Sequence, residues 1–165
     1  MPMLHIYDAG DGMISWVARQ RTEARHLLGV RDGELSDALF NLARAGRQFD
    51  RILFMTHGGP GSIWFGNGFV RAGWWQAERS NNLHRIAAPG ARIYFNGCNV
   101  AEGPAGWAFL EAAAELFLTL GGGEAFGQTS VGFASPFSGH VNHFWGRTRR
   151  VRVDPATNAL TRSES

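Results

Sequence analysis

The chain has 165 residues, 44% of them apolar, which suits one globular domain with a substantial core and leaves too little length for two. A formal net charge of +2, with clustered Arg147, Arg149, Arg150 and Arg152 that lack interleaved aromatic residues, argues against nucleic-acid binding. The single cysteine excludes an internal disulfide and a cysteine-rich zinc site.

The first residues, M-P-M-L-H-I-Y-D-A-G, lack the basic and apolar regions of a signal peptide, and no later run approaches a membrane span. We therefore expect a cytoplasmic protein, or one exported by a leaderless secretion system. Met3 to Tyr7 predicts a short strand, and D-A-G-D-G after it predicts a turn. Asp8 and Asp11 are thus expected at the exit of the first strand.

Two helical segments are predicted next. The segment from Ile14 to Leu28 has weak helical character, with Trp16 and Val17 as buried candidates. From Gly33 to Ala45 leucines recur at helical spacing, and a glycine follows the last of them. The second helix is expected to cover the sheet between the first two strands.

Arg51 to Thr56 is an unbroken apolar run of strand length, typical of a parallel strand covered on both faces. His57 follows it directly, ahead of a glycine run. The sequence S-I-W-F-G-N-G-F-V then predicts a small hairpin around the Asn67-Gly68 turn.

A helix is predicted over Trp74 to Ile86, and a buried strand over Ala91 to Phe95. The strand runs into a tight turn, N-G-C-N, that carries Cys98. A clear helix follows, with Pro104 in its first positions and a glycine triplet at its end. Such a turn presents a side chain near the positive end of a helix, where a thiolate is stabilised.

The remaining chain predicts a short strand within Glu124 to Phe133, an irregular loop over 131–140, and a late strand and turn over Arg149 to Leu160. Residues 161–165 are expected to form a loose tail. Strands alternating with helical segments predict an α/β fold, a three-layer α/β/α sandwich with a mainly parallel sheet. We expect one domain over 1–150, followed by a C-terminal strand or hairpin and tail over 151–165.

His57 and Cys98 each follow a strongly apolar strand. If the two strands are parallel neighbours, both residues leave the same edge of the sheet, where open α/β folds place their active sites. Alone, a cysteine is commonly a buried apolar residue and a histidine a satisfied structural one. The joint pattern favours a His/Cys dyad.

The order strand, His-Gly, hairpin, helix, strand, Gly-Cys, helix resembles the caspase-like (clan CD) cysteine peptidases, which include caspases, gingipains, legumains and separases. The wording T-H-G-G-P-G-S-I-W-F-G and I-Y-F-N-G-C-N-V-A-E-G-P-A-G-W-A-F-L is most similar to uncharacterised bacterial caspase-like domains found in large secreted or adhesin-type proteins. The resemblance covers roughly Arg51 to Phe133, about half of the chain.

The resemblance implies a caspase-like fold and a cysteine endopeptidase that needs no cofactor or metal. His57 matches the catalytic histidine and Cys98 the nucleophile. The backbone N–H groups of Gly58 and Cys98 match an oxyanion hole, and Gly97 matches the small residue that lets the chain turn. N-G-C-N-V departs from the caspase signature Q-A-C-[RQG]-G, so aspartate specificity is not implied.

In related folds the substrate pocket is built by the exit of the first strand, the segment before the cysteine and the strand after its helix. Here these positions are Asp8, Asp11, Asn96, Gln128 and Ser130. Acidic residues at the first two positions would favour arginine or lysine in the substrate. Their ordinary role as turn residues is the competing interpretation, and the stronger one.

Two alternatives to a peptidase remain at this point. One is a non-catalytic caspase-like module that binds a protein partner, with surface aromatics around Trp64 to Trp75 forming the interface. The other is a small-molecule amidase or acyltransferase that uses the same thiolate. His140 and His143 could join Cys98 at a metal, but their spacing is generic and no metal site is predicted. Peptide or protein substrates, and an activating or inhibitory protein, are the expected partners.

Overall fold

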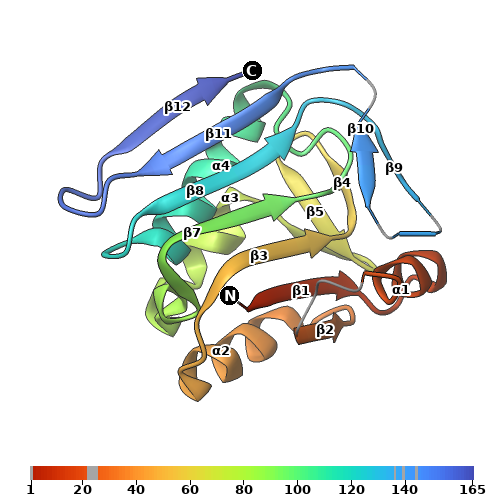
Figure 1. The fold of residues 1–165 in the computed structure, drawn as a ribbon, viewed down its shortest axis with the longest axis horizontal. Helices are drawn as coiled ribbons and strands as arrows, with labels where there is room; N and C mark the ends of the chain where they lie inside the picture. Colours follow the sequence, from red (N-terminus) through yellow and green to blue (C-terminus); the bar gives the residue numbers. More distant parts are fainter. Residues whose placement is uncertain (1, 22–25, 136, 139, 144) are drawn as a thin grey trace.

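The computed structural model describes residues 2–21, 26–135, 137–138, 140–143 and 145–165. Within them a seven-stranded sheet has the order β12-β11-β8-β7-β3-β1-β2 (Figure 1). The strands that run parallel are β1 (Met3–Asp8), β2 (His26–Val30), β3 (Phe49–Met55), β7 (Ala87–Phe95) and β8 (Gly123–Gln128). β11 (Thr148–Val153) and β12 (Leu160–Glu164) complete one edge in antiparallel pairing, so the sheet is mixed but mainly parallel.

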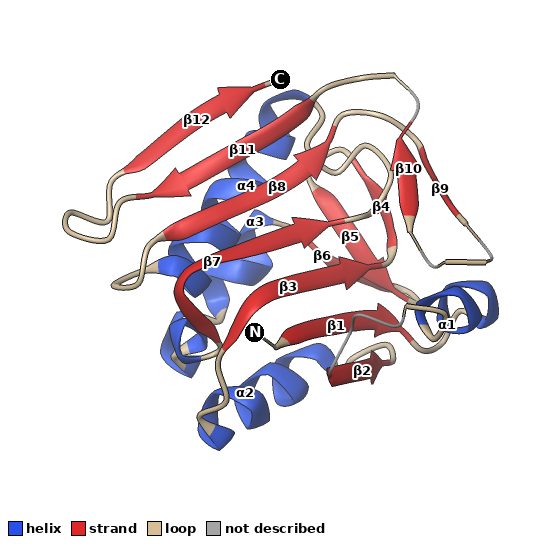
Figure 2. Cartoon of the chain, viewed as in Figure 1, coloured by secondary structure: helices blue, strands red, loops and turns tan. Residues whose placement is uncertain are grey.

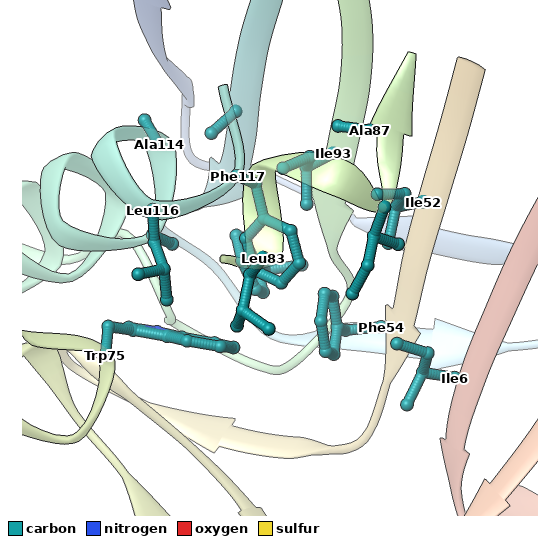
Figure 3. Close-up of a cluster of buried hydrophobic side chains, with 14 of the residues drawn as sticks. Ile6, Ile52, Phe54, Trp75, Leu83, Ala87, Ile93, Ala114, Leu116 and Phe117 are labelled. Atoms are coloured by element: carbon teal, nitrogen blue, oxygen red, sulfur yellow. The ribbon is translucent and has the colours of Figure 1, made fainter. Parts of the chain in front are cut away.

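The main core lies between the sheet and three helices on one of its faces. These are α2 (Leu35–Ala45), α3 (Ala72–Ala77) and α4 (Gly103–Leu118). In Figure 2, α3 and α4 lie behind the strands and α2 lies below β1 and β2. Alternate residues of the central strands, such as Ile52, Phe54 and Ile93, point into this core. Figure 3 shows Phe54, Trp75 and Phe117 at its centre, and the rings of Phe54 and Trp75 meet edge to face at 5.8 Å.

The other face of the sheet is covered unevenly. One helix, α1 (Gly12–Ala18), packs there against the carboxyl ends of β1 and β3, where Val17, Ala18 and Met55 form a small second cluster. In Figure 1 no helix of the described chain lies in front of β7, β8 and β11. The expected α/β fold is therefore present, but the predicted third layer is reduced to this one short helix.

Two small sheets stand at the carboxyl edge of the large one. The strands β4 (His57–Gly59), β5 (Ser62–Phe65) and β6 (Gly68–Val70) form an antiparallel sheet with the predicted hairpin as its last two strands. β9 (Gly132–Ala134) pairs with β10 (Val141–His143) in a second ladder. The predicted irregular loop over 131–140 was therefore wrong in part, because its first residues pair with a strand that lies beyond it.

Most predicted elements are confirmed close to their expected bounds. The helix predicted over Gly33 to Ala45 is α2, which Gly46 ends in a left-handed conformation at φ 70°. The predicted strand at Arg51 to Thr56 is β3, the one at Ala91 to Phe95 is the last part of β7, and the helix containing Pro104 is α4. None of the described helices is long and apolar enough to cross a membrane.

Two helix predictions were wrong in part. The helix predicted from Ile14 to Leu28 ends at Ala18, and His26–Val30 forms β2, which pairs in parallel with β1; residues 22–25 lie outside the described residues. Trp16 is 53% exposed rather than buried, whereas Val17 is buried as expected. In place of the helix predicted from Trp74 to Ile86, α3 ends at Ala77 and two short 3-10 turns follow. Asn82 separates these two turns, and its φ of 53° is one that a helix cannot contain.

The end of the chain is also more ordered than predicted. β11 crosses the boundary expected at residue 150, and β12 occupies the segment expected to be a loose tail. The hairpin belongs to the main sheet because β11 pairs along its whole length with β8. Val151 and Val153 add to the main core.

Candidate active site

The sheet brings the ends of β3 and β7 together. These two strands are parallel neighbours, and the ladder continues past β7, where the N–H of Asn96 donates to the carbonyl of Phe54 at 2.9 Å. His57 begins β4 just after β3, and Cys98 lies in the turn just after β7. The expectation that both residues leave the same edge of the sheet is therefore confirmed.

The two segments touch through glycine backbone. A Cβ placed on Gly58 would lie 2.9 Å from the carbonyl oxygen of Cys98 and 2.9 Å from the Cα of Gly97. A Cβ placed on Gly97 would in turn lie 3.0 Å from the Cα of Gly58. Only glycine at both positions allows this approach. The backbone segments that carry His57 and Cys98 are consequently in direct contact at this edge of the sheet.

His57 is exposed and its ring is held on two sides. Its Nε2 lies 2.9 Å from Oδ2 of Asp11, which comes from the start of α1. The ring stacks on Trp64, the cross-strand neighbour of His57, with centroids 6.1 Å apart and planes 20° apart. These contacts fix the orientation of the imidazole although it faces solvent.

The carboxylate of Asp11 determines which nitrogen of His57 carries the proton. The N–H of Ile14 donates to Oδ1 of Asp11 at 2.9 Å, and this bond first, followed by the one from His57, lowers the pKa of Asp11 below its ordinary value of 3.8. An ionised carboxylate only accepts hydrogen bonds. Nε2 is therefore the protonated nitrogen of the neutral ring, and Nδ1 is the one that can accept a proton.

Cys98 is partly exposed, and its thiol donates to the carbonyl of Gly132 in β9 at 3.7 Å. The turn that carries Cys98 is hydrogen-bonded to the end of β8 and the residues after it. The N–H of Asn99 donates to the carbonyl of Ser130, and the N–H of Ala101 donates to the carbonyl of Gln128. Asn99 adopts the left-handed conformation, at φ 55°. The cysteine therefore stands on a turn that its neighbours fix at several points.

Arg149 in β11 anchors the chain between Cys98 and α4. Its Nη1 donates to the carbonyls of Ala101 and Gly103 at 2.7 Å each, and its Nε donates to Glu164 at 2.7 Å. The guanidinium also stacks over the ring of Trp107 at 4.7 Å. The C-terminal hairpin thus supports the cysteine turn directly.

The predicted substrate residues at the exit of β1 have other partners. Asp8 is 2% exposed, and its two carboxylate oxygens accept the N–H groups of Gly10 and Gly66, which ties the β1 exit to the β5–β6 turn. Asp11 caps α1 and binds His57. The prediction that both aspartates line a pocket for a basic substrate residue loses its basis, because these contacts occupy their carboxylates.

Asn96 does line a cavity, of about 320 Å³, on the second face of the sheet. The cavity is also lined by Arg21, Arg51, Tyr94 and His140, so its charged walls are basic rather than acidic.

Gln128 and Ser130 contribute differently from the prediction. Their carbonyls support the cysteine turn, the amide of Gln128 donates to Thr148, and the side chain of Ser130 is buried.

Among the described residues, no group of three His, Cys, Asp or Glu side chains is arranged to hold a metal ion. His143 is half-buried, its Nδ1 lies 3.3 Å from the carbonyl of Ser130, and burial lowers its pKa.

The aromatic residues predicted to form an interface differ in their surroundings. Trp75 is fully buried in the core, Trp74 is partly buried and packs edge to face on it at 5.1 Å, and Trp64 contacts His57.

Two residues of the site were missed from the sequence. The bond from His57 to Asp11 joins positions 46 residues apart, and Asp11 was interpreted as a turn or pocket residue. A signal was present, since an aspartate three residues before a helical N–H is a typical N-cap and so placed α1 at this edge. Arg149 carried no signal, because its role depends on β11 pairing with β8.

Comparison with known proteins returned few relatives. No curated protein matches the chain. One solved structure, titled "The crystal structure of a short chain dehydrogenase family protein from Francisella tularensis subsp. tularensis SCHU S4", is 15% identical with a TM-score of 0.37, and the match covers 69% of this chain and 59% of that one. The present chain thus spans less than two thirds of that protein's length. A family described as a domain of unknown function, DUF4347, matches residues 16–119, well over half of the chain, and the chain belongs to this family.

Proposed function

We propose that this protein is a cysteine peptidase of the caspase-like type, in which Cys98 is the nucleophile and His57 the general acid and base. The observation that carries the proposal is the glycine contact between Gly58 and Gly97, which holds the histidine and cysteine segments side by side at the carboxyl edge of the sheet. The hydrogen bond from His57 to Asp11 supports it, because a carboxylate that orients the imidazole is a recurring partner of a histidine base.

The reaction would be acyl transfer to the thiol. The sulfur of Cys98 attacks the carbonyl carbon of the scissile peptide bond, and the thiol proton passes to Nδ1 of His57. The tetrahedral intermediate collapses with cleavage of the C–N bond, and His57 gives the proton to the leaving amine. Water then attacks the thioester, with His57 accepting its proton, and the carboxylic acid leaves as the thiol re-forms.

Two backbone N–H groups, those of Gly58 and Cys98, would stabilise the oxyanion. They belong to the two segments that the glycines bring into contact, and this close approach supports the assignment of both donors to one oxyanion hole. Each such donor is typically worth about 3 to 4 kcal/mol of transition-state stabilisation.

The order of elements supports the caspase-like assignment. β3 leads to His57-Gly58, β5 and β6 form the small hairpin, and β7 leads to Gly97-Cys98 and α4. This is the order from which the resemblance was drawn. The reduced third layer departs from the three-layer sandwich expected of a caspase-like domain. Here α2, α3 and α4 cover one face of the sheet, and α1 alone packs on the other.

The test is hydrolysis of a mixed peptide library, with cleavage sites identified by mass spectrometry, by the wild type and by Cys98→Ala and His57→Ala. We expect cleavage by the wild type alone. Cys98→Ser serves as the matched control for shape, and it should lose most activity as well because a hydroxyl is a weaker nucleophile. Hydrolysis of simple amides with intact peptides would support the small-molecule amidase, and activity that survives in Cys98→Ala would overturn the dyad.

A non-catalytic, partner-binding module is the second candidate, and one observation favours it. The segment beside Cys98 exposes large apolar side chains, with Phe137 91% and Trp145 86% exposed. The thiol of Cys98 also donates to Gly132 of β9, in the same region. Under this alternative the library stays intact and Cys98 remains unmodified by peptide electrophiles.

A further inference from the structure

The second face of the sheet is open over β7, β8 and β11, and its side chains form two rows. Register places Arg92, Glu124 and Arg152 in one row, with Arg51 next to Arg92. Tyr94, Phe126 and Arg150 form the next row. The residues between the rows, such as Ile93, Ala125 and Val151, point to the opposite side and belong to the main core. We call these seven outward residues the open sheet face.

The open sheet face is cationic. Its arginines, Arg51, Arg92, Arg150 and Arg152, are all exposed. The acidic residue among the seven is Glu124, which lies 3.1 Å from Arg150 and 3.7 Å from Arg92. One carboxylate against four guanidiniums leaves a positive surface, which is complementary to an acidic partner.

The middle of the face is aromatic. The rings of Tyr94 and Phe126 stack with centroids 4.9 Å apart and planes 10° apart. A cavity of about 320 Å³ lies on the Tyr94 side, and another of about 210 Å³, bordered by Arg150, lies on the Phe126 side. An aromatic centre with hollows beside it and arginines around it has the composition of a protein-binding surface.

The strands under this face are the kind that proteins usually cover. Parallel strands are typically buried on both faces by helices, and β3, β7 and β8 are mutually parallel neighbours. The described helices of this chain lie elsewhere, as Figure 2 shows: α1 lies at the carboxyl ends of β1 and β3, α3 and α4 lie behind the sheet, and α2 lies below β1 and β2. The layer that would complete the sandwich over β7, β8 and β11 is therefore not supplied by the described part of the chain.

We propose that the open sheet face binds an acidic amphipathic helix of a partner protein, whose apolar stripe covers Tyr94 and Phe126 and whose carboxylates meet the surrounding arginines. A helix satisfies its own backbone hydrogen bonds, and the backbone of these strands is already hydrogen-bonded to neighbouring strands. The contact between them is therefore made by side chains, which are what the open sheet face presents. The proposal does not depend on the peptidase reaction, because none of the seven residues of the open sheet face has a role in the proposed acyl transfer.

Single-stranded nucleic acid fits this face less well. Tyr94 and Phe126 stack on each other, so their facing surfaces are not available to bases. Glu124 lies among the arginines and would repel phosphates. The helix avoids both problems, because it needs only the ring edges and can place its carboxylates away from Glu124.

The test uses a synthetic helical peptide of about 21 residues, with leucine and alanine repeated along one face and glutamate elsewhere. Fluorescence anisotropy of the labelled peptide with the full chain should show saturable binding that weakens as salt is raised. The double variant Arg51→Glu, Arg152→Glu should weaken binding at least about tenfold. The control Arg31→Glu, Arg44→Glu changes the same charge at exposed positions outside the face and should stay within about twofold.

Phe126→Ala, checked for an unchanged melting temperature, should also weaken binding, since it removes one ring of the aromatic centre. The proposal is overturned if the acidic peptide does not bind, or if both double variants weaken it equally. It is also overturned if a peptide with lysine in place of glutamate binds with equal affinity. The same holds if an oligo(dT) strand binds more tightly than the acidic peptide and loses this affinity in the variant Arg51→Glu, Arg152→Glu. A wild-type dimer that this double variant dissociates would instead identify a second copy as the occupant.

Discussion

Asp11 joins two parts of the site with one carboxylate. Oδ1 accepts the N–H of Ile14 and so caps α1, while Oδ2 binds Nε2 of His57. The residue that begins α1 is therefore also the one that orients the ring of His57. Asparagine has the same shape and caps helices equally well, but it lacks the charge that holds the protonated nitrogen of His57.

Asp11→Asn separates the two roles. We expect folding to be retained and kcat/KM for peptide hydrolysis to fall by at least about tenfold, part of the 10²- to 10⁴-fold that a positioned acid and base contributes. Asp154→Asn is the matched control, because Asp154 accepts backbone N–H groups in the β11–β12 turn. Equal kcat/KM in wild type and Asp11→Asn would show that the bond to His57 has no catalytic role.

Acid stability follows from the lowered pKa of Asp11. The unfolded chain takes up a proton near the ordinary value of 3.8, whereas the folded chain does so only at lower pH. The ionised carboxylate therefore stabilises the fold fully above that ordinary value, and the stabilisation is lost as pH falls through the folded pKa. Urea unfolding should show a gap between wild type and Asp11→Asn that narrows as pH falls below about 4. A gap that is constant across this range would contradict the account.

At the scale of elements, the C-terminal hairpin acts as a brace for the cysteine turn. Arg149 is the link, since its guanidinium binds the carbonyls of Ala101 and Gly103, pairs with Glu164 of β12 and stacks on Trp107 of α4. Its side chain is only 17% exposed, so water replaces these contacts poorly. Removal would leave two carbonyls next to the active-site turn without their charged donor.

We expect Arg149→Ala to lower the free energy of unfolding by about 2 to 4 kcal/mol, because hydrogen bonds to charged groups are worth about 1.5 to 3 kcal/mol each. Arg152→Ala, at an exposed position three residues along the same strand, should change it by no more than about 0.5 kcal/mol. Chemical denaturation of both variants measures the difference. Similar losses in the two would mean that β11 stabilises the sheet without bracing the turn.

The sequence predicted elements that are encoded locally and missed those that depend on distant partners. Arg51 to Thr56 and the helix with Pro104 carry strong apolar and capping signals within themselves, and both are present. The sequence predicts helix up to Leu28, whereas His26–Val30 forms β2, because the strand identity of this segment comes from pairing with β1. In the site, the His57 and Cys98 segments could be placed by their strands, whereas the Asp11 and Arg149 contacts span 46 and 48 residues.

At the scale of the whole molecule, the sheet rather than the sequence order decides what belongs to the fold. The boundary predicted at residue 150 cuts through β11, and Val151 and Val153 beyond it are buried in the main core. The edge hairpin also shields β8, which would otherwise present an unpaired edge.

A chain that ends at Arg150 should therefore lose cooperative unfolding and expose apolar surface. A control that lacks only Ser165 loses two edge hydrogen bonds with Thr148 and should melt close to the full chain. Thermal denaturation followed by circular dichroism, with dye binding to exposed apolar surface, compares the two. A cooperative transition in the shorter chain would show that 1–150 folds alone, as the sequence first indicated.

The catalytic assignment is tested most directly by covalent labelling of Cys98 with a panel of peptidyl acyloxymethyl ketones, followed by intact mass and peptide mapping. These weak electrophiles require an activated thiol in a substrate-binding groove. The account predicts a single adduct, on Cys98, that forms far more slowly in His57→Ala although the thiol is still present and reacts with a maleimide. Equal labelling of wild type and His57→Ala, or no adduct with any member of the panel, would contradict it.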